Sequence, residues 1–215
     1  GFVDVVALAS SNQERANAQA EVLSVPKAYG DWRELIADPE VEVVDICTSN
    51  VLHYPMAKGA LEAGKHVICE KPLAMNSHET ADLARIARGK RLVNAVTFNH
   101  RFYPLVQEAR ELLSRKDLGD IFIIRGGFLQ DWLLYDTDYN WRVEAAQGGA
   151  PRAVGDIGSH WLDTIQYITG LTISSVYADF GTFIPVRKRP LKPVDTFANK
   201  ELRPEDYEER VVDTE

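Results

Sequence analysis

The chain has 215 residues, 45% of them hydrophobic, and a formal net charge of −8. This length suffices for one large or two small domains with a buried core, and no apolar run reaches the roughly 18 residues of a membrane span. The acidic balance argues against a nucleic-acid-binding surface, and the short basic run 187–189 is better interpreted as a solvated loop.

The first half of the chain alternates strands with helices. Apolar runs rich in β-branched residues predict strands buried on both faces, and stretches that follow capping residues predict helices. The expected strands are 3–9, 43–47, 66–69 and 92–96, and the expected helices are 13–23, 55–63 and 77–88, with Gly64 and Ser77 as caps. This alternation indicates βαβ units, so we expect a Rossmann-type, doubly wound parallel sheet.

The second half has a different pattern. The expected elements are a helix over 104–114, a strand over 121–129, a loose stretch over 131–152, a helix that carries Asp156 and His160, and a strand over 173–184. We place the boundary near 97–101, which predicts one domain over 1–98 and a second over 99–215.

One expected motif is missing. A dinucleotide-binding sheet begins with a strand, a glycine-rich turn and a helix whose N-terminus binds the pyrophosphate. No G-x-G-x-x-G occurs in the sequence, which opens on what looks like a second strand and ends at 211–215 as another strand begins. We therefore expect a fragment of a longer protein; the alternative is a compact domain that never had this loop.

The two cysteines, Cys47 and Cys69, lie in apolar runs that favour strands. Two such residues fit buried free thiols in a reducing compartment better than a disulfide framework or a metal site. The start of the chain lacks the pattern of a secretory signal. We expect a cytoplasmic protein without a bound metal.

Three residues have the chemistry for oxidising an alcohol. Asp156 and His160 are spaced i, i+4, which places both on one face of a helix. A carboxylate beside an imidazole can move a proton near pH 7. Lys71 follows the third expected strand, and a lysine can stabilise negative charge on a substrate oxygen. The set suits removal of a hydroxyl proton while a hydride passes to a cofactor.

Four short motifs occur in a fixed order, and together they carry a family resemblance: Glu70-Lys71-Pro72, Asn99-His100-Arg101-Phe102, Trp141-Arg142 and Asp156-x-x-x-His160. With them the chain resembles the glucose–fructose oxidoreductase / inositol dehydrogenase / MocA family of nicotinamide-dependent sugar dehydrogenases over nearly its whole length. The resemblance implies a dinucleotide-binding domain followed by an α+β domain with an open, mostly antiparallel sheet. It also implies a homodimer or homotetramer formed through that sheet.

The resemblance implies roles for the three residues. Lys71 would contact the substrate hydroxyl and the nicotinamide ribose, His160 would be the general acid/base, and Asp156 would bind the hydroxyl and bias the histidine. From the residues alone, the alternatives are a surface lysine, a core histidine on an amphipathic helix and a helix N-cap. Asp163, one turn beyond His160, either orients the ring or has a solvent-facing or capping role.

Further residues are expected to bind NAD or NADP and the substrate. The expected cofactor contacts are Ser10, Ser11, Arg15, Thr48, Asn50, His53, Glu70, Lys71, Asn99, Trp141 and Arg142, and the expected substrate contacts are Lys71, Arg101, Arg152, Asp156 and His160. Strand two ends in serines instead of the acid that binds an adenosine 2′-hydroxyl, and Arg15 would pair with a 2′-phosphate. Both cofactors therefore stay open.

The predicted function is oxidation of a secondary hydroxyl of a sugar, cyclitol or sugar derivative by hydride transfer to NAD(P). Two alternatives stay open: a glycosidase-like enzyme that uses transient oxidation by a tightly held nicotinamide, and a non-catalytic regulatory module on the same fold. The expected partners are a small sugar or polyol and further copies of the chain, without nucleic acid or membrane.

Overall fold

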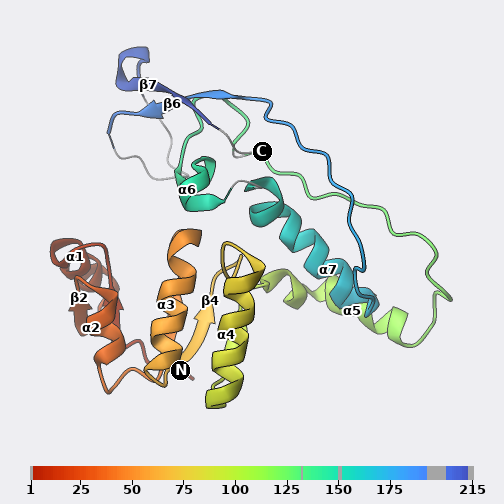
Figure 1. The fold of residues 1–215 in the computed structure, drawn as a ribbon, viewed down its shortest axis with the longest axis horizontal. Coiled ribbons are helices and arrows are strands. Elements are labelled where there is room, and N and C mark those ends of the chain that lie inside the picture. The colour runs from red at the N-terminus through yellow and green to blue at the C-terminus, as the bar shows by residue number, and fades with distance from the viewer. Residues whose placement is uncertain (1, 132, 150–151, 193–201, 213–215) are drawn as a thin grey trace. The chain divides into compact units, whose positions relative to one another are not determined.

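A computed structural model gives the structure of the protein and describes residues 2–131, 133–149, 152–192 and 202–212. The chain divides into two compact units, one of residues 1–48 and 52–97, the other of 49–51 and 98–215. Figure 1 shows the elements of each unit. None of the helices within the described ranges has both the length and the hydropathy that crossing a membrane requires.

The first unit contains two parallel sheets. β1 (Ala7–Ala9) pairs with β2 (Lys27–Tyr29), and β4 (His66–Cys69) lies between β3 (Val43–Ile46) and β5 (Asn94–Val96). All the pairings in both sheets are parallel. This confirms the predicted Rossmann-type parallel organisation.

Helices follow the strands of this unit. The helices are α1 (Gln13–Leu23), α2 (Trp32–Ala37), α3 (Asn50–Glu62) and α4 (Ser77–Lys90). Of these, α1, α2 and α4 begin at capping residues. The bounds of α1 agree with the prediction, because the Asn12 side chain accepts a hydrogen bond from the Arg15 N–H. Two predictions were wrong. Asn76 caps α4, and α3 begins five residues before Pro55, which lies inside the helix.

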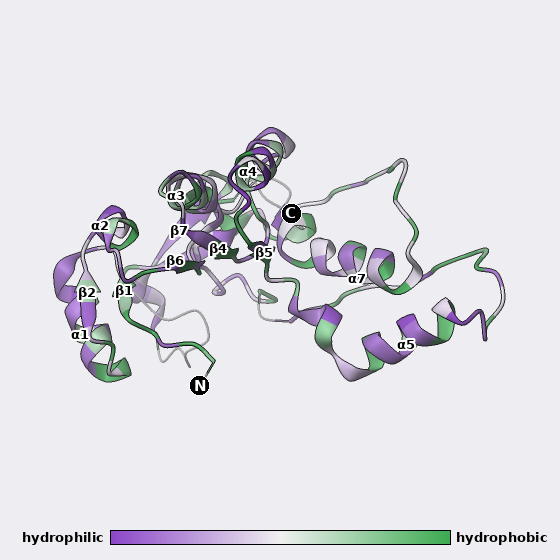
Figure 2. Cartoon of the chain, turned by 90° about the horizontal axis from the view of Figure 1, so that it is seen from below, coloured by the Kyte–Doolittle hydropathy of each residue, from purple (hydrophilic) through white to green (hydrophobic). Residues whose placement is uncertain are grey.

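One face of the β3–β4–β5 sheet is buried under α3 and α4, which Figure 2 shows on the same side of it. The core here consists of Val44, Ile46, Val67, Cys69, Ala57, Ala60, Leu61, Leu83, Ile86 and Ala87. On the other face, Val43 and Ile68 are 48% and 40% exposed. The prediction of strands buried on both faces was therefore wrong for β3 and β4. Cys47 is also exposed, whereas Cys69 is buried as predicted.

A polar cluster at Asp38 ties β2 to the end of α2. The Asp38 carboxylate accepts hydrogen bonds from Lys27 Nζ at 2.8 Å, from Tyr29 Oη at 2.9 Å and from the Glu40 N–H at 2.9 Å. The hydrogen bond from Lys27 is the largest of these influences, and together they lower the pKa of Asp38 to about 2. The carboxylate therefore stays ionised well below its ordinary range.

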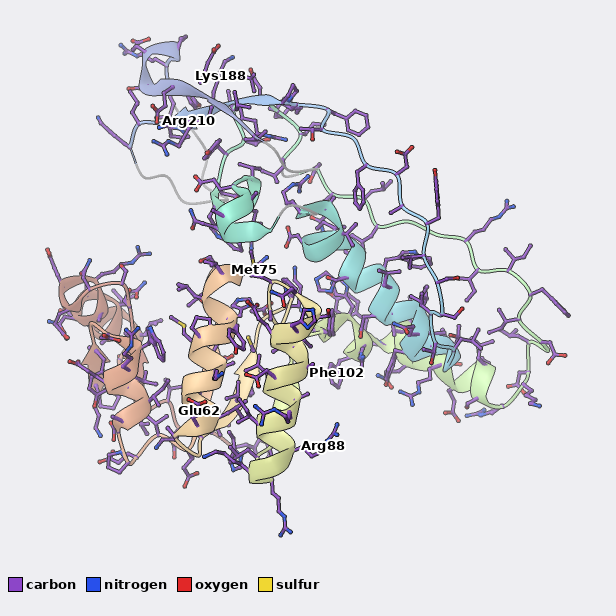
Figure 3. All side chains as sticks on the ribbon, in the orientation of Figure 1. Glu62, Met75, Arg88, Phe102, Lys188 and Arg210 are labelled. Carbon is purple, nitrogen blue, oxygen red and sulfur yellow. The ribbon has the colours of Figure 1, made fainter. Side chains whose placement is uncertain are left out.

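The second unit is helical at its centre and ends in a hairpin. Its elements are η1 (Asn99–Phe102), α5 (Pro104–Ser114), η2 (Trp141–Val143), α6 (Ala145–Gly148), the π-helix η3 (Val154–Gly158), α7 (Ser159–Thr169), β6 (Val186–Pro190), η4 (Pro204–Asp206) and β7 (Tyr207–Val211). α5 has its predicted bounds and packs along α7. β6 and β7 form an antiparallel pair, on which Figure 3 labels Lys188 and Arg210. This pair confirms that antiparallel strands follow the parallel sheet.

The predicted strands 121–129 and 173–184 are not strands in this structure. Both segments lack helix and strand, and their backbone is not part of a sheet ladder among the described residues. Phe122 and Tyr177, from one segment each, are 90% and 95% exposed. Their β-branched and aromatic composition favours a strand, but a strand also requires a neighbour whose N–H and C=O groups it can pair with.

Candidate functional site

Lys71 lies directly beyond the carboxyl end of β4. The Glu70 N–H donates to the Ile46 carbonyl at 2.9 Å, and the Glu70 carboxylate accepts from the Lys71 N–H at 3.1 Å. The Lys71–Pro72 peptide is cis, and Lys71 is half-buried. In parallel sheets ligands bind outside the carboxyl ends of the strands, so Lys71 has the location that its predicted role requires.

His53 of α3 bridges the turns that follow β3 and β4. Its side chain is fully buried, with Nδ1 2.7 Å from the Pro72 carbonyl oxygen and Nε2 3.0 Å from the Thr48 carbonyl oxygen. The ring joins the backbone on one side of Lys71 to the end of the neighbouring strand. The structure thus shows both ring nitrogens in contact with the chain itself.

The remaining predicted cofactor residues of the first unit follow β1 and β3. The Ser10 N–H donates to the Tyr29 carbonyl at 3.1 Å, which extends the β1–β2 ladder, and Ser11 and Arg15 are exposed at the start of α1. Thr48 follows β3, and its hydroxyl lies 3.8 Å from Met56 Sδ. Polar side chains therefore follow β1, β3 and β4 at their carboxyl ends.

Within the second unit, His160 is enclosed by aromatic rings. The His160 ring is stacked on His100, with 4.1 Å between ring centroids and 26° between planes. Phe128 is near-parallel to it at 5.8 Å, and Phe98 meets it edge-on at 6.1 Å. His160 is only 9% exposed. The ring is thus held in a packed aromatic environment in which its orientation is restricted.

Asp156 precedes α7 in a π-helical turn. The Ser159 N–H donates to the Val154 carbonyl five residues earlier, which closes the wider turn. Asp156 therefore lies inside the turn, and the alternative that it is an N-cap was wrong. Its carboxylate is buried, and its Oδ2 lies 3.5 Å from Arg142 Nε. Arg142, predicted from the resemblance, thus places a positive charge beside Asp156, the carboxylate that is predicted to bind the substrate.

Asp163 binds Arg101 through both carboxylate oxygens. Arg101 Nε donates to Oδ2 at 2.8 Å, and Nη2 donates to Oδ1. The carboxylate raises the pKa of the Arg101 guanidinium, mainly through these hydrogen bonds. The pair links η1 to α7. His100 lies on η1 and His160 lies on α7.

Three other predicted residues complete this part of the site. Asn50, grouped with the second unit, is buried and donates from Nδ2 to the Gly148 carbonyl at 2.9 Å. The Arg142 guanidinium lies 4.4 Å from the centre of the Trp141 ring. Asn99 is exposed on η1. The contacts of Asn50 and Arg142 hold residues 141–148 in place.

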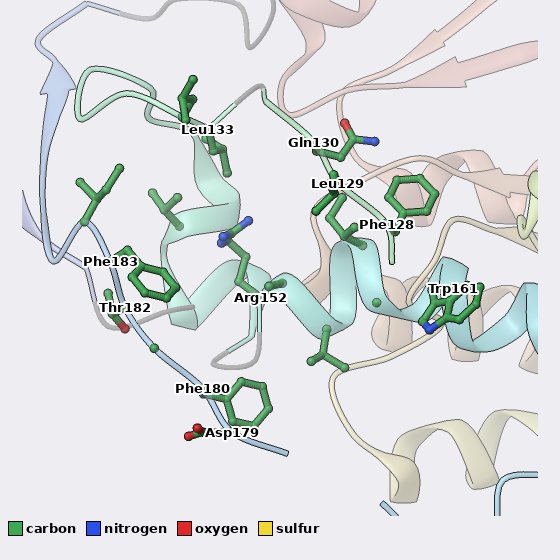
Figure 4. Close-up of a pocket in the computed structure, with 18 of the residues that line it drawn as sticks. Phe128, Leu129, Gln130, Leu133, Arg152, Trp161, Asp179, Phe180, Thr182 and Phe183 are labelled. Carbon is green, nitrogen blue, oxygen red and sulfur yellow. The ribbon is translucent and has the colours of Figure 1, made fainter. Parts of the chain in front are cut away.

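A cavity of about 700 Å³ lies inside the second unit (Figure 4). Arg152 and Phe128 line it together with Trp161, the residue after His160. Arg187 is also in its wall, is buried, and donates to the backbone carbonyls of residues 133, 135 and 138. The predicted substrate residue Arg152 therefore faces a space large enough for a small ligand, and Phe128 joins this space to the rings around His160.

His100 and Phe128 lie at this site but were not predicted as site residues. His100 stood inside one of the quoted motifs, but ring stacking depends on tertiary contacts that spacing does not reveal. Among the described residues, no three His, Cys, Asp or Glu side chains are grouped so that they would hold a metal ion.

Two family profiles match the chain. Residues 1–98 match the profile described as an oxidoreductase family with an NAD-binding Rossmann fold, and residues 106–208 match the GFO/IDH/MocA C-terminal domain. Together they extend over most of the chain.

Named relatives agree with these profiles. The chain is 38% identical to a levoglucosan dehydrogenase of Pseudarthrobacter phenanthrenivorans over 86% of its length and 47% of the relative. It is 40% identical to a trans-1,2-dihydrobenzene-1,2-diol dehydrogenase of Xenopus laevis over 77% of its length and 47% of the relative. A levoglucosan dehydrogenase structure in complex with NADH and levoglucosan superposes with a TM-score of 0.81 at 38% identity, over 88% of this chain and 51% of that one. The chain thus spans about half the length of these relatives.

Proposed function

The chain belongs to the GFO/IDH/MocA oxidoreductase family, and from this premise we propose that the protein is an NAD(P)-dependent dehydrogenase that oxidises a secondary hydroxyl of a sugar or cyclitol. The observation that carries the proposal is a buried His160 four residues after a buried Asp156, whose carboxylate lies 3.5 Å from Arg142, in a chain whose first unit has the NAD-binding fold. The names of the levoglucosan and dihydrodiol dehydrogenases support a cyclic substrate with a ring hydroxyl.

In the proposed reaction, His160 is the general base that removes the hydroxyl proton. Its ring is buried, and the neighbouring rings restrict its rotation. Its nitrogens are therefore oriented before the substrate binds, and little side-chain entropy is lost in the reaction. Asp156 accepts a hydrogen bond from the substrate, and Arg142 at 3.5 Å holds that carboxylate in place. Lys71 stabilises the negative charge that develops on the substrate oxygen.

The residues at the strand ends fit a nicotinamide dinucleotide. Ser10, Thr48 and Lys71 follow β1, β3 and β4, where such cofactors bind in parallel sheets. When bound, NAD(P) supplies the hydride acceptor. We assign His53 to positioning the Lys71 turn, because its side chain has no exposed surface and both its nitrogens contact backbone carbonyls. Arg15, exposed on α1, is where a 2′-phosphate of NADP would be recognised.

The domain division and the assembly are part of the proposal. We assign residues 1–98 to the nucleotide-binding domain and 99–215 to the substrate and oligomerisation domain, which the family profiles support. We also propose that the protein is a homodimer or homotetramer.

The test is a measurement of nicotinamide reduction by the full-length protein. NAD and NADP are each offered with levoglucosan, inositols, aldoses and a trans-dihydrodiol, and reduction with one class defines both cofactor and substrate. His160→Ala and Lys71→Met should lower turnover by about 10²- to 10⁴-fold. His78→Ala removes an exposed histidine of α4 and should leave turnover within twofold, about the variation expected of a surface change.

Two outcomes would contradict the proposal. Unchanged turnover in His160→Ala would remove the general base from the mechanism. The second outcome is cleavage of a glycosidic bond by a protein whose nicotinamide stays bound through purification and is not consumed. This result would favour the glycosidase-like reaction over the dehydrogenase reaction.

A further inference from the structure

The face of the His160 ring is covered by a second titratable ring. His100 of η1 stacks on it at 4.1 Å and is also parallel to Phe128, at 5.3 Å and 8°. The nitrogens of an imidazole lie in the ring plane, so a ring stacked on its face restricts rotation and leaves the nitrogen edge for partners. His100 therefore limits the directions in which His160 can hold a proton.

The carboxylates near His160 each have a positive partner. Asp156, four residues before His160, has Arg142 at 3.5 Å. Asp163, three residues after it, is bound by Arg101 through both oxygens. The attraction that these carboxylates exert on a proton at His160 is therefore largely offset by the two guanidinium groups.

The other rings packed against His160 in the described part of the second unit are Phe98, Phe128 and His100. The two phenylalanines carry no charge. His100 is thus the ring neighbour whose charge can change between pH 5 and 8 and act on His160 at short range.

We propose that His100 is a positioning residue for His160, which fixes its orientation by stacking and keeps it neutral by taking the first proton of the pair. This inference rests on the proposed role of His160 as the general base. Two imidazolium rings in contact repel each other, so the pair binds its two protons in separate steps. Burial disfavours charge, and His160 is buried whereas His100 is half-buried, so the first proton goes to His100.

The proposal predicts coupled titration of the two rings. In the wild-type protein, His160 should take its proton in the second step. His100→Phe keeps a ring at this position but removes its charge, so His160 should then titrate at a pH higher by about 1 unit or more. The acid limb of kcat/KM should move in the same direction.

A smaller side chain at position 100 separates the effect of stacking on orientation from the effect of charge. His100→Ala removes both charge and ring, so it should move the acid limb like His100→Phe while lowering kcat about tenfold or more below that variant. Phe98→Leu is the matched control, because it alters an uncharged ring against His160. It should lower kcat without moving the acid limb.

The deciding measurement is an NMR pH titration of the histidine side chains in the full-length protein, wild type and His100→Phe. Coupled steps in the wild type and the upward shift in His100→Phe support the inference. Single-step, independent titration in the wild type overturns it even if the variant does not fold, and an unchanged His160 midpoint in a folded variant also overturns it. Absence of dehydrogenase activity would contradict the proposed function while leaving this NMR result readable.

Discussion

Replacing His53 with leucine should destabilise the first unit by about 1–4.5 kcal/mol. The His53 ring has no exposed surface, and its nitrogens lie 2.7 and 3.0 Å from the carbonyl oxygens of Pro72 and Thr48. At least one nitrogen carries a hydrogen, so leucine leaves at least one half-buried carbonyl without the hydrogen bond from His53, which costs about 1–3 kcal/mol. The changed side-chain shape in a packed position adds up to about 1.5 kcal/mol.

Two amide variants divide the effect between the two contacts. An asparagine amide nitrogen occupies roughly the place of Nδ1, so His53→Asn should retain the Pro72 contact; glutamine places its nitrogen near Nε2 and should retain the Thr48 contact. If the Pro72 contact positions the turn at Lys71, His53→Asn should keep more turnover than His53→Gln at equal stability.

The assay is urea denaturation of the purified protein followed by circular dichroism, with midpoints compared at constant slope. Val22→Ala, at a position 83% exposed on α1, is the control and should change the free energy of unfolding by less than about 0.5 kcal/mol. A His53→Leu variant as stable as this control would show that the bridge between the two strand ends does not stabilise the fold.

Three further predictions concern stability. Asp163→Ala should lower the free energy of unfolding by about 1–3 kcal/mol, which is less than for a fully buried pair because its partner Arg101 is 42% exposed. Calorimetry that shows no change would mean that the Arg101–Asp163 pair does not stabilise the fold. Gly126→Ala should cost about 1–3 kcal/mol because the new Cβ would lie 2.4 Å from the Trp161 ring, whereas Gly127→Ala meets nothing within 4 Å, so equal melting temperatures would contradict the contact. The pKa of Asp38 in the folded protein is about 2, below the ordinary carboxyl pKa near 4. Its contribution to the free energy of unfolding is therefore complete above about pH 4 and is lost as pH falls towards 2. Asp38→Asn should make the free energy of unfolding less dependent on pH over that window, and an unchanged acid transition would show that this cluster is not its source.

Elements with a strong local signal were predictable from the sequence. α1 follows the capping residue Asn12, and Pro104 occupies the first turn of α5, where its missing N–H has no helical partner to lose. β2 and α2 were missed because they are three and six residues long. The available signal was Asp31, which caps α2 and has Glu34 three residues later.

The elements that depend on distant partners could not be predicted. The segments 121–129 and 173–184 have strand composition, but strand formation depends on a neighbouring ladder, which no local pattern encodes. For the site, the spacing of Asp156 and His160 indicated a helix, yet it could not reveal a π-helical turn between them. The stacking of His100 on His160 likewise follows from the way η1 packs on α7.

The π-helical turn at Val154–Gly158 restricts how this gene can diverge. A π turn holds about one more residue than the α turn that it replaces. If one codon were deleted here, the helix would continue with α geometry, and every residue ahead of α7 would rotate by about 100° around its axis relative to His160. Asp156 and His160 would then no longer share their present arrangement, even though both residues were kept. In related lineages, insertions and deletions should therefore accumulate in the connections around 115–140 and be excluded from 154–158, where selection acts on length as strictly as on residue identity.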